Sequence, residues 1–360
     1  MKIAIVAATK KGVRLAEIAA ARLTETGEHE IVLFLPGKFS LLRIEGQREP
    51  FRRPLREIFG ELFGEYQGIV CVMALGIVVR LVAPHLQDKT KDPAVVVTDE
   101  LGQNVISVIS GHFGGANDLA VQLANGLGAN PVITTATDVN GLPAVEMLAK
   151  DNGWLIEPFA LIKKVNSAIV NGEKVMIYSD AVLDLEPTDH IEVKDFAQYS
   201  SFRKEKGRVV LVTNRAADNF PPGTLCLRPQ NLCIGIGCRR GAGAVEVQEA
   251  VKAALAEAGR AVLSVRSLAT VDIKNDEQGF LAAADELNLS VEFFGRQALG
   301  AVLAERKEEL GFSKLVDDKI GVGGVCEPAA ILGAGETSRL ILPKTKYGKV
   351  TVAIAEGDWL

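Results

Sequence analysis

The sequence predicts an α/β protein of several domains, with a doubly wound, largely parallel sheet in its N-terminal domain and a separate α/β domain at the C-terminus. Short apolar runs with strand composition alternate with segments whose apolar residues recur at helical spacing. The chain has 360 residues, which is longer than one hydrophobic core usually serves. Its 48% hydrophobic and 24% charged residues are ordinary for a soluble globular protein.

In the first predicted domain, residues 1–140, strands and helices alternate in chain order. Such alternation favours parallel strands joined by crossover helices. Gly27 and Pro84 end the first and third predicted helices. The expected strands are 2–9, 29–36, 68–74, two strands within 94–110 around an Asp-Glu-Leu-Gly-Gln turn, and 131–136; the expected helices are 12–27, 54–66, 76–86 and 116–128.

Two further domains are expected, at residues 141–228 and 229–360. The third domain opens with a strand, a glycine-rich turn and a long helix within 232–259. It ends in a β-hairpin at 338–357, with its turn at 346–349. For the middle domain the expected helices are 142–153 and 159–172, the expected strands are 154–157, 174–179 and 208–214, and residues 216–224 have the composition of a linker.

Charge, cysteine content and hydropathy exclude several classes of protein. The net charge of −5 argues against a nucleic-acid binder. No apolar run reaches the roughly 18 residues that a membrane helix needs, and the N-terminal run is too short for a signal peptide. Five cysteines without C-x-x-C spacing indicate reduced thiols, not a disulfide framework or a zinc site. We therefore expect a cytoplasmic protein with no metal site, no membrane and no nucleic-acid partner.

Residues 110–118, SGHFGGAND, lie where a strand passes into a helix and raise the question of a nucleophilic serine. A nucleophile elbow has the pattern G-x-S-x-G. Around Ser110, the two glycine positions of that pattern hold Val108 and His112. The stretch therefore departs from an elbow, and a Ser–His–acid triad would need the histidine to reach a serine from elsewhere in the fold.

The glycines of the same stretch favour an anion-binding turn. Gly114 and Gly115 precede the helix, so their N–H groups could hold an oxyanion or a carboxylate. His112 stands beside them, with a pKa suited to acid or base catalysis. The alternatives are a structural histidine and a helix that is merely capped by Asn117 or Asp118.

Residues 134–141, TTATDVNG, close the next predicted strand. If that strand is parallel to the preceding one, both segments lie at the same edge of the sheet. Ligands of such sheets gather at the carboxyl ends of the strands. Thr134, Thr135, Asp138 and Asn140 are therefore candidates for the same cleft as His112, with turn and cap chemistry as the alternative.

The third domain carries a second glycine-rich turn, GIGCRRG, at residues 235–241. Its third glycine falls at Gly241, one position beyond the place that the dinucleotide fingerprint requires. Arg239 and Arg240 suit carboxylates, because a guanidinium pairs with a carboxylate through two hydrogen bonds. Arginines that only contact solvent are the alternative.

Other charged residues of this domain have simple structural explanations beside functional ones. Lys274 and Glu277 lie in a polar loop before a helix, where a solvated salt bridge is the simplest interpretation. Glu327 precedes a proline at a predicted first helical turn, where an acid stabilises the helix N-terminus. Cys326 has no histidine near it in sequence, so a buried thiol is favoured over a nucleophile. The lysines of the hairpin predict a solvated edge; they are Lys344, Lys346 and Lys349.

Longer segments resemble a known family. Residues 74–120 and 131–146 resemble the N-terminal domain of the cobalt-precorrin-5A hydrolase family, CbiG, of anaerobic cobalamin biosynthesis. Four later segments resemble that family's C-terminal domain, which is shared with the cobalamin-biosynthesis protein CobE. Residues 141–225 fit the family's variable middle region. The four later segments are 233–251, 268–280, 321–332 and 349–355.

The resemblance implies a hydrolase that opens the ring A δ-lactone of a cobalt-tetrapyrrole, expels acetaldehyde and yields cobalt-precorrin-5B. It implies no cofactor beyond the cobalt that arrives with the substrate, and transient contact with neighbouring enzymes of the pathway. A base must take the proton of the freed alcohol while a carbon–carbon bond breaks, and His112 suits this base. A polycarboxylate macrocycle needs cations. We assign Ser110, His112 and Asp138 to catalysis, and Gly114, Gly115, Asn117, Thr135, Arg239, Arg240, Lys274 and Glu327 to substrate binding, with Arg80 as a further candidate.

Two other function classes stay open. The glycine-rich turn at 235–241 could hold a nucleotide in an oxidoreductase or a methyltransferase, although the displaced third glycine counts against this. A non-catalytic corrinoid carrier is the other alternative, because the C-terminal segments are shared with CobE.

Overall fold

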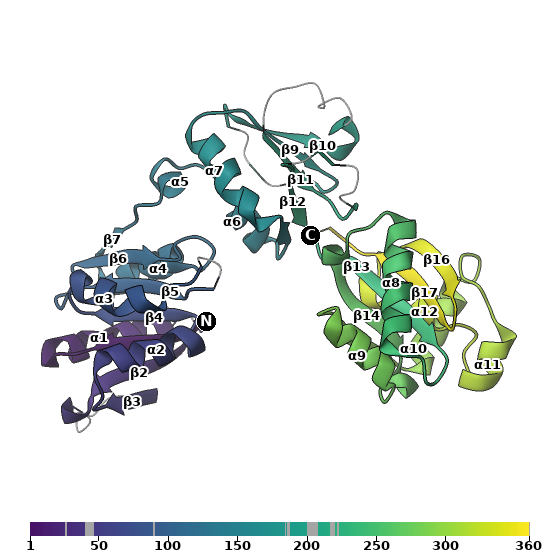
Figure 1. The fold of residues 1–360 in the computed structure, drawn as a ribbon, viewed down its shortest axis with the longest axis horizontal. Helices are drawn as coiled ribbons and strands as arrows, with labels where there is room; N and C mark the ends of the chain where they lie inside the picture. The colour runs from purple at the N-terminus through teal and green to yellow at the C-terminus, as the bar shows by residue number, and fades with distance from the viewer. Residues whose placement is uncertain are drawn as a thin grey trace. The chain divides into compact units, whose positions relative to one another are not determined.

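A computed structural model describes residues 1–25, 27–39, 47–88, 91–183, 185, 188–199, 208–216, 220–221 and 223–359. Within these residues the chain forms two compact units, Met1–Met147 and Leu148–Leu360, and three separate sheets (Figure 1). The sheets span residues 2–132, 155–228 and 232–356. The predicted α/β class with largely parallel sheets is confirmed.

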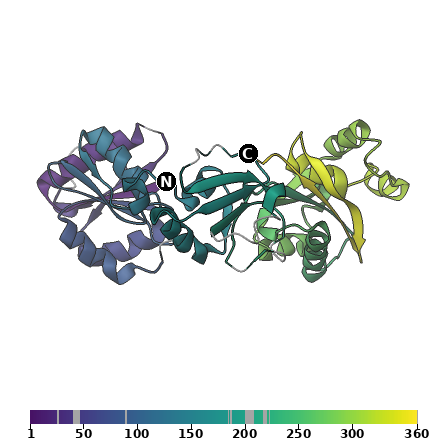
Figure 2. The same ribbon diagram turned by 90° about the horizontal axis from the view of Figure 1, so that it is seen from above.

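The first unit is built on a seven-stranded sheet in the order β3-β2-β1-β4-β5-β6-β7. Alternate residues of the central strand β1 face opposite layers: Ile3 and Ile5 join the core under α1 and α4, whereas Ala4 and Val6 join the core under α2 and α3. Figure 2 shows helices on both faces of this sheet. The elements are β1 Lys2–Ala7, α1 Lys10–Thr24, β2 Glu30–Pro36, β3 Gln47–Phe51, α2 Leu55–Glu65, β4 Gly68–Val72, α3 Leu75–Val82, β5 Ala94–Thr98, β6 Asn104–Ile109, α4 Ala116–Leu127, β7 Asn130–Val132 and α5 Ala136–Val139.

The direction of β6 decides where the SGHFGGAND stretch lies. Strands β1 to β5 are parallel, but β6 is antiparallel to β5, and β7 is parallel to β6. Residues 110–118 and 134–141 therefore follow strands that end at the same edge, as predicted. That edge is the one where β1, β4 and β5 begin, so it is opposite to the carboxyl ends of the five parallel strands.

The second unit begins with a five-stranded sheet in the order β10-β9-β11-β12-β8, in which only β8 is antiparallel to its neighbour. The strands β10 and β12 were not predicted from the sequence. The predicted linker at 216–224 lies partly outside the described residues. The elements of this part are α6 Val145–Asp151, which starts in the first unit, β8 Leu155–Glu157, α7 Ile162–Val170, β9 Val175–Ser179, β10 Ile191–Asp195, β11 Arg208–Val212 and β12 Leu225–Arg228.

The C-terminal sheet has the order β15-β14-β13-β17-β16, with the predicted hairpin β16–β17 antiparallel to β13. Helices α8 and α9 cover one face, and α10 and α12 cover the other. At Gly235 an added Cβ would lie 1.8 Å from the carbonyl oxygen of Cys326, so this glycine permits the close packing of α12 on β13. The elements are β13 Leu232–Cys238, α8 Ala244–Ala258, β14 Val265–Val271, α9 Gln278–Glu286, β15 Ser290–Phe294, α10 Arg296–Glu305, α11 Lys314–Ile320, α12 Cys326–Ala334, β16 Arg339–Tyr347 and β17 Val350–Glu356.

Candidate functional site

The first candidate site is a hydrogen-bonded group that we call the His112 cluster: His112, Asn117, Thr137, Asp138 and Glu146. The imidazole Nδ1 lies 3.0 Å from Glu146 Oε1, and Nε2 lies 2.5 Å from Asp138 Oδ2. Thr137 Oγ1 lies 3.0 Å from the same Nε2. The Glu146 side chain is 7% exposed and that of Asp138 is 39% exposed. The imidazole therefore lies between one buried carboxylate and one that reaches solvent.

Asn117 joins this cluster to the neighbouring chain segments. Its Nδ2 donates to Thr135 Oγ1 at 3.0 Å and to Asp138 Oδ2 at 3.2 Å, and its Oδ1 accepts from Ser107 Oγ at 2.7 Å. Helix α4 begins after Gly115, and this N-cap position has no side-chain cap hydrogen bond. The side chain of Asn117 bonds within the cluster, so the capping interpretation of Asn117 is wrong. Asp118 lies in the first turn of α4, where an acid stabilises the helix N-terminus.

Ser110 has a structural contact. Its Oγ donates to the carbonyl oxygen of Asp92 at 2.9 Å, and its φ is 58°, in the left-handed region. The hydroxyl that contacts the imidazole among the described residues is that of Thr137, which is itself only 3% exposed.

The two glycines of the turn differ in what their N–H groups can do. The N–H of Gly115 donates to the carbonyl oxygen of His112 at 2.9 Å, so it is already used within the turn. The N–H of Gly114 forms no hydrogen bond within the described ranges. An added Cβ at Gly114 would lie 2.4 Å from the Cβ of Ser110, so the turn itself requires this glycine. Of the predicted pair, only Gly114 offers a donor to an oxyanion.

The carboxylates change the titration of the histidine. The hydrogen bond with Glu146 is the largest cause that raises the pKa of His112 above its usual value; burial opposes it, and the bond with Asp138 adds to it. The imidazolium is therefore favoured in this site. A proton donor at Nε2 next to a carboxylate that reaches solvent is an arrangement suited to acid–base chemistry.

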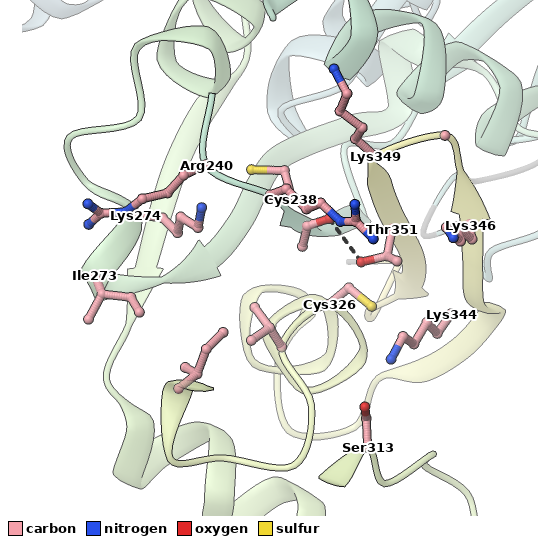
Figure 3. Close-up of a pocket in the computed structure, with 15 residues that line it drawn as sticks. Cys238, Arg240, Ile273, Lys274, Ser313, Cys326, Lys344, Lys346, Lys349 and Thr351 are labelled. Atoms are coloured by element: carbon pink, nitrogen blue, oxygen red, sulfur yellow. Dashed lines mark hydrogen bonds between the residues drawn. The ribbon is translucent and has the colours of Figure 1, made fainter. Parts of the chain in front are cut away.

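The second candidate site, which we call the cationic cavity, is a space of about 640 Å³ in the C-terminal domain (Figure 3). Of the 15 residues that line it, six are Lys or Arg and none is Asp or Glu. The cations come from the turn after β13, from the turn after β14 and from the hairpin β16–β17. They are Arg239, Arg240, Lys274, Lys344, Lys346 and Lys349.

Glu277 holds two of the segments that line this cavity. Its Oε2 accepts the N–H of Gly241 at 3.2 Å, and its Oε1 lies 3.5 Å from Lys274 Nζ and 3.8 Å from Arg240 Nε. The side chains of Lys274 and Glu277 are each only 10% exposed. The interpretation of this pair as a solvated salt bridge is therefore wrong.

Glu327 holds the hairpin that carries the other cations. Its Oε1 accepts the N–H of Lys344 at 3.0 Å, and its Oε2 accepts the N–H of Gly311 at 3.3 Å. The residue is 4% exposed and does not line the cavity, and no side chain caps α12. Its contact is with the backbone that positions Lys344.

The hairpin lysines line the cavity, which the sequence did not predict. Lys344 and Lys346 lie two positions apart on β16, which is the spacing of one strand face. Neither of them, nor Arg239, forms an ion pair among the residues that the structure describes, whereas Lys349 pairs with Glu246 at 3.2 Å. The expected solvated edge is therefore part of the cavity wall.

Most of the chain is similar to proteins of one known family. Models of one family match successive parts of it: Cobalamin synthesis G N-terminal at residues 57–138, Cobalamin biosynthesis central region at 143–229 and Cobalamin synthesis G C-terminus at 232–355. A cobalt-precorrin-5A hydrolase of Priestia megaterium is 33% identical over 98% of this chain and 94% of its own. This chain belongs to the cobalt-precorrin-5A hydrolase family.

Further relatives agree with this membership and confirm the resemblance found in the sequence. A cobalt-precorrin-5A hydrolase of Salmonella typhimurium is 35% identical over 74% of this chain and 76% of its own. Protein CobE of a Sinorhizobium species is 35% identical over 34% of this chain and 79% of its own. The cationic cavity lies within the C-terminal match. The His112 cluster lies in the N-terminal match, except Glu146, which falls in the central-region match.

Two other residues that the sequence proposed for the site, Arg80 and Asn140, form hydrogen bonds within their own helix or turn. Arg80 donates to the carbonyl oxygen of Gly76 within α3, and Asn140 donates to that of Ala136 in the turn after α5. Burial raises the pKa of the Cys326 thiol to about 11 and also raises that of Cys238. Both cavity thiols are therefore neutral near pH 7, which agrees with the prediction that Cys326 is not a nucleophile.

Metal-ligand groups and membrane-crossing helices are both absent from the described part of the chain. No three His, Cys, Asp or Glu side chains lie together as metal ligands would. No helix there is both long enough and apolar enough to cross a membrane.

Proposed function

We propose that this chain is a cobalt-precorrin-5A hydrolase, which opens the ring A δ-lactone of a cobalt-tetrapyrrole and releases acetaldehyde to give cobalt-precorrin-5B in anaerobic cobalamin biosynthesis. The observation that carries the proposal is the similarity to the Priestia megaterium hydrolase over 98% of this chain. Cobalt arrives with the substrate, and the chain needs no cofactor of its own. The enzyme works in the cytoplasm and meets neighbouring enzymes of the pathway only transiently.

The His112 cluster supports the chemistry. Lactone opening requires that a water lose a proton as it attacks the ester carbonyl, and that the departing alkoxide gain one. His112 and Asp138, joined by a hydrogen bond of 2.5 Å, supply an acid and a base side by side. The N–H of Gly114 stabilises the negative charge on the carbonyl oxygen. The same pair takes the proton of the freed alcohol as the carbon–carbon bond breaks. The alcohol carbon becomes the carbonyl carbon of acetaldehyde, and the electron pair of the broken bond passes into the conjugated macrocycle.

The cationic cavity supports the binding of the macrocycle. A cobalt-precorrin carries many carboxylates, and carboxylates pair strongly with guanidinium and ammonium groups. Arg239, Lys344 and Lys346 are the cations of the cavity without an ion pair in the described part of the chain. They are the side chains that we expect to contact the substrate carboxylates first.

The test is turnover. Purified protein is incubated anaerobically with cobalt-precorrin-5A, acetaldehyde is measured with alcohol dehydrogenase and NADH, and the macrocycle is identified by mass. We expect one acetaldehyde for each macrocycle converted. Binding of the macrocycle without release of acetaldehyde would show a carrier and overturn the proposal.

A further inference from the structure

Each nitrogen of His112 faces a carboxylate oxygen, and the two carboxylates differ in exposure. Glu146 Oε1 lies 3.0 Å from Nδ1 and its side chain is 7% exposed, while Asp138 Oδ2 lies 2.5 Å from Nε2 and its side chain is 39% exposed. An imidazole donates from both nitrogens only when it is the imidazolium. The geometry is therefore that of a charged histidine between a buried anion and an accessible one.

We propose that Glu146 is a positioning residue that holds His112 as an imidazolium, so that His112 is the general acid and Asp138 the general base of lactone opening. This inference rests on the proposed function of the chain as a lactone hydrolase. Of the two carboxylates, Asp138 is the one exposed enough to accept a proton from a water beside a bound ester. Glu146 acts through Nδ1, away from the reacting atoms.

The step balances in atoms and protons. Asp138 takes a proton from the attacking water while the water oxygen bonds to the carbonyl carbon. The ester C–O bond then breaks, and the Nε2–H of His112 protonates the departing alkoxide oxygen. Asp138 now holds the extra proton and returns it to Nε2 across their 2.5 Å hydrogen bond. One water is consumed, and the new carboxylic acid ionises to solvent.

The surroundings of the imidazole fit this division of roles. Its titratable neighbours among the described residues are Glu146 on α6 and Asp138 on α5, and α4 contributes only the amide of Asn117, which donates to Asp138 Oδ2 at 3.2 Å. Thr137 Oγ1, at 3.0 Å, helps to fix the ring. Hydrogen bonding with Glu146 is the largest cause that raises the pKa of His112, so loss of that carboxylate lowers this pKa.

The first experiment follows His112 without substrate. The chain has four histidines, so NMR titration of the full-length protein resolves the His112 signal, assigned by its loss in His112→Asn. In Glu146→Gln, which keeps the side-chain shape, we expect the pKa of His112 to fall. In Glu146→Asp, which keeps the charge, we expect a smaller change. Glu65→Gln, an exposed acid on α2, is the matched control and should leave the titration unchanged.

The second experiment measures acetaldehyde release against pH. Because the acid must be protonated, Glu146→Gln should move the alkaline limb of the kcat profile to lower pH, with kcat at neutral pH reduced about 10- to 100-fold and KM nearly unchanged. An unaltered His112 titration in Glu146→Gln overturns the inference. So does a loss of kcat by one factor at every pH, since this would mean that Glu146 only supports the fold.

The two proposals fail in distinguishable ways. If the wild-type chain releases no acetaldehyde, the hydrolase function and the acid–base assignment both fail, while a lowered His112 pKa in Glu146→Gln would still identify Glu146 as the residue that holds the imidazolium. If wild-type turnover is normal and Glu146→Gln behaves like Glu65→Gln, only the role of Glu146 fails. Thermal unfolding of each variant separates loss of fold from loss of charge.

Discussion

The His112 cluster and the cationic cavity hold their charges in opposite ways. In the cluster, one imidazole lies between two carboxylates, and contacts of 2.5 to 3.2 Å join its members. In the cavity, six cations share a wall without an acidic side chain, and Glu277 and Glu246 pair with only some of them. The cluster has its partners in place before a ligand arrives, which suits proton transfer. We expect the cavity cations to gain partners when an anion binds.

Under the proposed function, this difference assigns catalysis to the cluster and binding to the cavity. The protein carries a net charge of −5, so the cavity is a local exception to its overall charge. Like charges that face one another repel, and a ligand with several carboxylates relieves this repulsion. Changes in the cluster should therefore alter kcat, and changes in the cavity should alter affinity.

Replacement of the general base should have the largest effect. Asp138→Asn keeps the side-chain shape but removes the proton acceptor, so we expect kcat for acetaldehyde release to fall about 10²- to 10⁴-fold, with substrate affinity changed by no more than about threefold. Single-turnover assays and absorbance titration with cobalt-precorrin-5A measure the two quantities separately. Asp151→Asn, an exposed acid on α6, is the control. A loss of affinity as large as the loss of kcat would place Asp138 in binding and break the separation.

Removal of cavity cations should have a smaller effect, and on affinity alone. Lys344→Gln combined with Lys346→Gln removes two ammonium groups, each expected to contribute about 0.7–1.4 kcal/mol to binding of carboxylates. We expect Kd to rise roughly 10- to 100-fold and to depend less on salt, with kcat within about twofold of wild type. The matched control is the exposed pair Lys163→Gln with Lys164→Gln on α7. Unchanged affinity in the cavity variant would mean that these lysines only contact solvent.

The sequence determines the two sites to different extents. The short turn predicted at residues 99–103 joins its two strands as an antiparallel pair. This local turn therefore determines at which edge of the sheet residues 110–118 lie. The proximity of His112 to Asp138 follows from the predicted parallel neighbour strand. Glu146 could not be predicted in the same way, because it lies 34 residues beyond His112 at the start of a helix with no distinguishing motif.

The cavity depends on pairing between distant segments. Strand β17 lies beside β13, with Val350 opposite Cys238. This pairing places the hairpin turn next to Arg239, whose backbone N–H donates to the carbonyl oxygen of Lys349. Nothing local predicts that pairing. One strand that was missed elsewhere, β3, is poor in local signal: it contains a proline and mostly exposed residues, as an edge strand permits.

Substitution of Ser110 should have the smallest effect on activity. It tests whether Ser110 belongs to the catalytic group around His112. Ser110→Ala removes the hydrogen bond to the carbonyl of Asp92 but keeps a side chain at a φ of 58°, so we expect a loss of about 1 kcal/mol in the free energy of unfolding and kcat within about threefold of wild type. Ser110→Gly loses the same bond but relieves about 1 kcal/mol of left-handed backbone strain, so its stability should be nearer that of wild type.

Urea unfolding and acetaldehyde release measured on both Ser110 variants separate the two possible roles of this residue. If Ser110 is structural, the free energy of unfolding should decrease from wild type to Ser110→Gly to Ser110→Ala. The kcat should then differ little among the three proteins. A nucleophilic serine predicts that both variants lose kcat alike, whatever their stability. If that second pattern appeared, the hydroxyl of Ser110 would have to leave Asp92 and reach the substrate during turnover, and the cluster would work through a covalent intermediate in place of an activated water.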